Sequence, residues 1–144
     1  LINLLLSGCA EEAEQDIRSN RSELEKITRL AEVGDPIAQN NLGLSYYRGE
    51  NVPQDFNKAL EWYGKATAQG HASAQYNLGV MYKDGRGAEK NLIEAYAWYN
   101  LAFAFGDKDA QSERDGLGLK DGEISQARVL SSEIYKMIVA QRGN

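Results

Sequence analysis

The stretch GDPIAQNNLGLSYYRGENVPQDFNKALEWYGKATAQ, residues 34–69, is followed at once by a second version of itself, GHASAQYNLGVMYKDGRGAEKNLIEAYAWYNLAFAF, residues 70–105. Superposed without a gap at an offset of 36 residues, the two segments agree at 13 of 36 positions, among them Leu42 with Leu78 and Trp62 with Trp98. A fixed period of this length is typical of a repeat array. The fold therefore depends on what one unit is and on how successive units stack.

Each unit is predicted to be a pair of helices. In the first helix Ala38, Leu42 and Tyr46 recur every four residues, which is one apolar stripe, and Gly49 can end the helix in the left-handed conformation. After a polar loop, Asp55 is a suitable N-cap for a second helix. The second helix and its counterpart in the next unit carry the same apolar stripe, made of Ala59, Trp62, Tyr63 and Ala66, then Ala95, Trp98, Tyr99 and Ala102.

Gly43 and Gly79 lie inside the first helices at equivalent positions. A glycine within a helix costs about 1 kcal/mol relative to alanine, so these two need a reason other than helix propensity. We expect close packing, with the first helix of a unit pressed against the small side chains of Ala59 and Ala66 on the second.

These residues resemble the Sel1-like repeat, a relative of the tetratricopeptide repeat. The pattern AxxxLGxxYxxG, then D, KAxxWYxKA and G, is met in the first unit by Ala38, Leu42, Gly43, Tyr46, Gly49, Asp55, Lys58, Ala59, Trp62, Tyr63, Lys65, Ala66 and Gly70. The second unit keeps most positions but has Asn91 in place of the Asp, Glu94 in place of the first Lys, and Asn100-Leu101 after its Trp-Tyr. The resemblance covers residues 34–106 and implies an all-α fold, a right-handed α/α solenoid of helix-turn-helix repeats with helical caps.

The segments on either side of the two repeats are predicted to be these caps. Leu24, Ile27, Leu30 and Ala31 form a stripe that corresponds, at the same offset, to the second helix of a unit. Terminal units of a solenoid are usually atypical because one face meets water. The expected organisation of the domain is a cap helix at 21–33, repeats at 34–69 and 70–105, a degenerate third repeat at 106–122 and a C-terminal cap helix at 123–141. A dimer seam is the alternative for that last helix.

The chain begins with an apolar run, LINLLLSGC, residues 1–9, which is typical of the end of a signal-peptide apolar region. Leu6-Ser7-Gly8-Cys9 resembles the bacterial lipobox, which implies removal of residues 1–8 and lipidation of Cys9. Ala10 at the next position resembles the outer-membrane sorting pattern. We therefore expect a lipid anchor in the bacterial cell envelope, facing the periplasm, with the acidic segment 9–20 as a tether. The alternative is a small buried cysteine in an N-terminal helix.

Composition and residue types argue against several classes of function. The formal net charge of −5 and the lack of a clustered basic segment make a nucleic-acid partner unexpected. The single cysteine excludes an internal disulfide and a multi-cysteine metal site. The lone His71 stands at the start of a first helix, where an N-terminal helix residue is the simpler interpretation. We expect no cofactor, no metal and no catalysis.

A binding surface is then the expected functional feature. In the related tetratricopeptide arrays the first helix of each unit lines the concave side, which implies a protein or peptide partner in that groove. The groove residues implied by this resemblance are Ile37, Asn40, Leu44, Tyr47, Arg48, Ser73, Tyr76, Val80, Lys83 and Asp84. The predicted function is a monomeric protein-interaction adaptor of the envelope. The alternatives are an inhibitory or structural envelope protein that binds a toxin or a cell-wall component, and a hydrolase.

Overall fold

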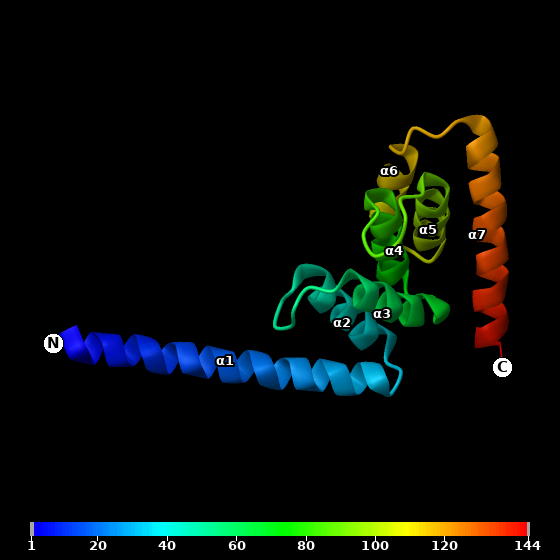
Figure 1. The fold of residues 1–144 in the computed structure, drawn as a ribbon. Helices are drawn as coiled ribbons and strands as arrows, with labels where there is room; N and C mark the ends of the chain where they lie inside the picture. Colours follow the sequence, from blue (N-terminus) through cyan, green and yellow to red (C-terminus); the bar gives the residue numbers. More distant parts are fainter. Residues whose placement is uncertain (1, 144) are drawn as a thin grey trace.

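The computed structural model describes the backbone of residues 2–143 and the side chains of residues 10–143, so the side chains of Cys9 and of the lipobox lie outside the described part. Within this part all regular secondary structure is α-helical, as predicted (Figure 1). The helices are α1 Ile2–Glu32, α2 Pro36–Arg48, α3 Phe56–Ala68, α4 Ala72–Asp84, α5 Leu92–Ala104, α6 Asp109–Asp115 and α7 Asp121–Arg142.

Two equivalent hairpins, α2 with α3 and α4 with α5, form the repeats. The Asp55 carboxylate accepts from the backbone N–H of Lys58 at 3.0 Å, so it caps α3 as expected. Asn91 caps α5 in the same way. Gly49 and Gly85 end α2 and α4 with φ angles of 72° and 71°, in the left-handed region that favours glycine.

The close approach expected at the two helical glycines is present, but the partner side chain differs from the prediction. A Cβ atom placed on Gly43 would lie 2.7 Å from ring carbons of Tyr63, and one on Gly79 would lie 2.7 Å from the same atoms of Tyr99. Each glycine is therefore covered by a tyrosine ring instead of by small alanine side chains, although the backbone oxygen of Ala59 also lies 3.3 Å from the Gly43 position. Both tyrosines are fully buried.

The apolar core continues from one helix pair to the next. One cluster joins α3 to α4 and contains Ala59, Tyr63, Ala66, Ala74, Leu78 and Met81. A second joins α5 to α6 through Ala95, Tyr99, Ala102 and Ala110, with α4 side chains packed against it. A third joins α1 to α2 through Ala31, Ala38 and Leu42. Because each cluster bridges successive units, the repeats are stabilised by stacking on their neighbours.

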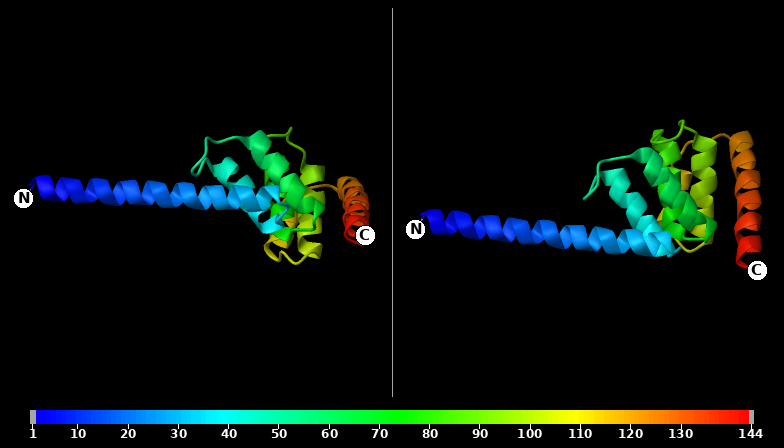
Figure 2. Two further views of the ribbon diagram at one scale, coloured as in Figure 1. Left: turned by 90° about the horizontal axis from the view of Figure 1, so that it is seen from below. Right: turned by 60° about the horizontal axis from the view of Figure 1, so that its bottom comes forward.

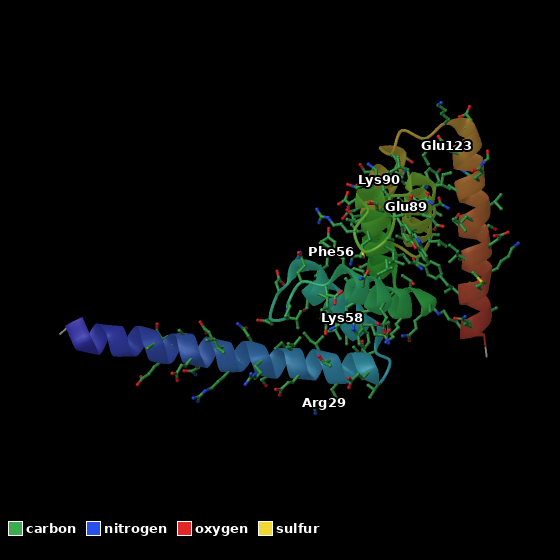
Figure 3. All side chains as sticks on the ribbon, viewed as in Figure 1. Arg29, Phe56, Lys58, Glu89, Lys90 and Glu123 are labelled. Atoms are coloured by element: carbon green, nitrogen blue, oxygen red, sulfur yellow. The ribbon has the colours of Figure 1, made fainter. Side chains whose placement is uncertain are left out.

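Helix α1 differs from its predicted bounds. A cap helix was expected over 21–33, but α1 begins at Ile2 and runs through the segment interpreted as a tether. Residues 10–20 contain neither glycine nor proline and are rich in Ala, Glu and Gln, which have high helix propensity. They extend away from the repeats, and all are exposed (Figures 2 and 3). No helix of the described residues is long and apolar enough to cross a membrane.

The degenerate third repeat is reduced to the short helix α6, which ends at Asp115 and is followed by Gly116. Helix α7 starts two residues before its predicted position and packs along α5. The Asn100 side chain donates to the Ser131 hydroxyl at 3.0 Å, and the Phe105 and Tyr135 rings lie 5.5 Å apart. Helix α7 thus covers the end of the second repeat.

Candidate interaction surface

One side of each first helix remains open to solvent. On α2 the side chain of Ile37 is 62% exposed, Asn41 and Arg48 are also exposed, and Leu44 is half-buried. These four positions recur every three or four residues, so they share one stripe of the helix. Together with the matching stripe of α4 they form what we call the first-helix face, made of Ile37, Asn41, Leu44, Arg48, Ser73, Asn77, Val80 and Asp84.

Asn40 is a correction to the predicted groove. Its side chain is only 8% exposed, and its Oδ1 accepts from Asn77 Nδ2 at 3.0 Å, so it joins α2 to α4 instead of facing a partner. The neighbouring Asn41 takes the exposed position, because one residue turns the side chain by about 100° around a helix. The signal for Asn41 was present in the sequence, since Asn41 and Asn77 are identical at the repeat offset.

Tyr47, also predicted to face the groove, is half-buried and structural. Its ring lies 5.6 Å from that of Phe56, and its hydroxyl accepts a hydrogen bond from Arg86. Figure 3 labels Phe56 at the start of α3. Arg86, in the α4–α5 loop, therefore ties the second repeat to the first, a role that the sequence did not reveal.

Tyr76 and Lys83 connect α4 to the remnant of the third repeat. The Tyr76 ring packs 5.4 Å from that of Tyr99, and burial followed by the nearby Glu113 carboxylate raises the pKa of Tyr76. Lys83 Nζ donates to Glu113 at 2.7 Å, and this hydrogen bond raises the pKa of Lys83. Both residues are half-buried, so their side chains are partly used within the fold.

The open positions combine three kinds of group. Leu44 and Val80, both half-buried, present part of their apolar surface, the exposed Asn41 amide can donate and accept hydrogen bonds, and charges of opposite sign stand at the ends of α2 and α4. The Asn77 amide is already partly used, because its Nδ2 donates to Asn40. An extended peptide offers the complementary groups, namely alternating side chains and free backbone N–H and C=O groups.

His71 has a structural role that explains its position. Its Nδ1 accepts from the backbone N–H of Ala74 at 3.3 Å, so the ring is the N-cap of α4. Burial lowers the pKa of His71, although the Asp35 carboxylate acts in the opposite direction. Within residues 10–143, no three His, Cys, Asp or Glu side chains are grouped so that they could hold a metal ion.

Comparisons with known proteins agree with this architecture. The Sel1 repeat family matches residues 36–71 and 72–104. A sel1-like repeat-containing protein of Acanthamoeba polyphaga mimivirus is 38% identical over 47 residues, which are 33% of this chain and 8% of that protein.

Solved structures extend the similarity to the cap regions. A protective antigen of uropathogenic Escherichia coli with an SLR fold superposes with a TM-score of 0.76 at 30% identity, over 82% of this chain and 26% of its own. A Sel1 repeat protein from Oxalobacter formigenes superposes with a TM-score of 0.62 at 33% identity, over 76% of this chain and 48% of its own. Cysteine rich protein B of Helicobacter pylori superposes with a TM-score of 0.61 at 25% identity, over 65% of this chain and 70% of its own. The chain thus spans less than half the length of the first two.

The stacked hairpins and the open first-helix face define an α-solenoid repeat protein, a class whose members present extended binding surfaces. The two matched repeats and the structural neighbours identify the family, and the chain is a Sel1-like repeat protein.

Proposed function

We propose that this chain is a non-catalytic adaptor of the bacterial cell envelope, which binds an extended segment of a partner protein on the first-helix face. Sel1 repeat proteins are generally protein-interaction adaptors, and the family is generally non-enzymatic. The observation that carries the proposal is the stripe of α2 that places the exposed Asn41 amide beside Ile37 and Arg48, continued on α4 by the exposed Ser73 and Asp84.

The size of this face sets the expected strength of binding. Two repeats offer a small surface, and interfaces below about 1,200 Å² are typical of weak or transient complexes. Micromolar affinity is therefore expected. A few central side chains should contribute most of the binding free energy, as in other interfaces.

The envelope location rests on the resemblance of Leu6-Ser7-Gly8-Cys9 to a lipobox and on the course of α1. From residue 9 to residue 21 a helix rises about 18 Å, at about 1.5 Å per residue. A lipid anchor on Cys9 would therefore hold the repeats away from the bilayer. Cys9→Ala should move the protein from the membrane fraction to the soluble fraction of cells that process lipoproteins. Unchanged fractionation would contradict the anchor.

Photo-crosslinking in cells tests the binding face itself. A benzophenone amino acid placed at Arg48 or Ser73, both exposed on the first-helix face, should trap a partner protein. The matched control places the same group at Glu61 or Lys65, which are exposed on α3. Trapping from the α3 positions alone would place the interaction on the second helices and overturn the proposal.

A further inference from the structure

Two neighbouring hollows lie at the C-terminal ends of α3 and α7. Figure 1 shows the end of α7 beside the end of α3, and residues of the two helices are in contact. The inner hollow has a volume of about 180 Å³ and the outer one about 460 Å³. Ala68 and Gln141 line both, so the two hollows lie next to each other, and we call the pair the α3–α7 crevice.

The inner hollow has apolar walls. Ile134, Met137 and Ile138 of α7 face the Trp98 side chain of α5 across it. Thr67 also lines it, but its hydroxyl already donates to a backbone oxygen of its own helix at 2.9 Å. Met137 is 57% exposed, so apolar surface in this wall is still in contact with water. Covering such surface with an apolar group is favourable.

The outer hollow is polar and carries a positive charge. Its lining consists of Pro36, Ala68, Gln69, Gln141 and Arg142, and among the described residues neither lining includes an acidic side chain. The Gln69 amide is already engaged, because its Nε2 donates to Gly34 O and to Gln39 Oε1. The Arg142 guanidinium is therefore the group that can attract an anion, with the Gln141 amide beside it.

Glycine at position 70 allows the guanidinium to sit at this place. A Cβ atom on Gly70 would lie 2.7 Å from Arg142 Nη1, and the φ angle of Gly70 is 76°. The end of α7 can thus bring its charge against the turn that follows α3. The crevice consequently has an apolar inner end and a cationic outer end.

We propose that the α3–α7 crevice binds a monocarboxylate with an apolar tail, of the medium-chain fatty acid class. The tail occupies the inner hollow and the carboxylate pairs with Arg142. The outer hollow alone falls within the range of about 300–1,000 Å³ that is usual for small-molecule sites. The inner hollow, at about 180 Å³, has room for part of a short alkyl chain.

The two tryptophans of the chain give a direct test. Trp62 packs near α1 and α2, under the ammonium of Lys65, while Trp98 lines the inner hollow. In a Trp62→Phe protein all tryptophan fluorescence comes from Trp98. Octanoate should change this emission in a saturable way, and calorimetric titration of the unsubstituted chain should give the same dissociation constant. Octylamine should not bind, because its charge repels Arg142.

Three variants separate the two ends of the site. Arg142→Gln should weaken octanoate binding by about fivefold or more while leaving octanol binding unchanged, since only the carboxylate needs the guanidinium. Ala68→Phe should abolish the binding of both, because Ala68 lines both hollows. The control Lys136→Gln, exposed on α7 outside both linings, should behave as the parent protein.

Several results would overturn the assignment. One is the absence of saturable octanoate binding. The others are octanoate binding to the Arg142→Gln variant that is as tight as to the parent protein, and octylamine binding that is as tight as octanoate binding. A leucine-terminated peptide that binds much more tightly than octanoate, and loses this advantage when amidated, would show that the crevice takes a protein C-terminus instead of a fatty acid. Melting curves of each variant confirm that the loss of binding is not a loss of fold.

Discussion

Replacing Gly79 with alanine adds one methyl group at the tightest contact between the two helices of the second repeat. The new Cβ would lie 2.7 Å from Cδ1 and Cε1 of Tyr99, where apolar carbons prefer about 3.5–4.0 Å. Tyr99 is fully buried and cannot move without displacing its neighbours, so the overpacking should cost about 1–3 kcal/mol. The gain in helix propensity offsets about 1 kcal/mol of this cost.

The same substitution at Gly64 is the matched control. Gly64 lies inside α3, and a Cβ atom placed on it has no neighbour within 4 Å. Gly64→Ala should therefore raise the free energy of unfolding by about 0.5–1 kcal/mol, through helix propensity alone. Urea denaturation should place the midpoint of Gly64→Ala above that of the parent and the midpoint of Gly79→Ala at or below it, with similar m values. Equal midpoints for Gly79→Ala and Gly64→Ala would refute the tyrosine packing argument.

Two further contrasts follow from the repeats. Folding lowers the pKa of His71, so the stability that its neutral ring contributes is fully present above about pH 6.5 and is lost as the pH falls through the folded-state pKa. His71→Asp should remove this part of the pH dependence of the melting midpoint. An unchanged pH dependence would contradict the neutral cap. Gln39 donates to Ala31 O and accepts from Gln69, whereas the buried amide of Gln75 has no hydrogen-bond partner among the described residues. Gln39→Met should therefore lower the free energy of unfolding by about 1–3 kcal/mol, while Gln75→Met should leave it unchanged or raise it. Urea midpoints of the two variants measure this difference.

The repeat offset was sufficient to predict the hairpins. Asp55 and Asn91 could be recognised as caps because their side-chain chemistry acts within three residues of the chain. The side chains that cover Gly43 and Gly79 could not be recognised from the sequence. Which side chain of the second helix covers a glycine depends on how the two helices are rotated against each other. The alanines and the tyrosine lie on the same apolar stripe, so the sequence allowed both solutions.

The binding face was predictable only in part, for similar reasons. Asn40 and Asn41 are adjacent in the chain, and only the rotation of α2 in the fold, which brings Asn40 against Asn77, decides which of them is exposed. Arg86 and Glu113 were missed because their partners are 39 and 30 residues away in the chain, and a degenerate third copy gave no equivalent position to compare. Residues 10–20 were interpreted as a tether from their polarity, which does not distinguish an exposed helix from an irregular segment.

The adaptor account is tested most directly by calorimetric measurement of the affinity between the trapped partner and two triple variants. The first variant replaces Ile37, Asn41 and Arg48, all exposed on α2, with alanine, and the second replaces Asn57, Glu61 and Lys65, all exposed on α3. Tyr47 and Tyr76 are left intact, because they pack within the fold. The account predicts a loss of about tenfold or more for the first variant and less than about twofold for the second, with unchanged melting midpoints. Weakened binding by the second variant, with the first binding as the parent does, would contradict it.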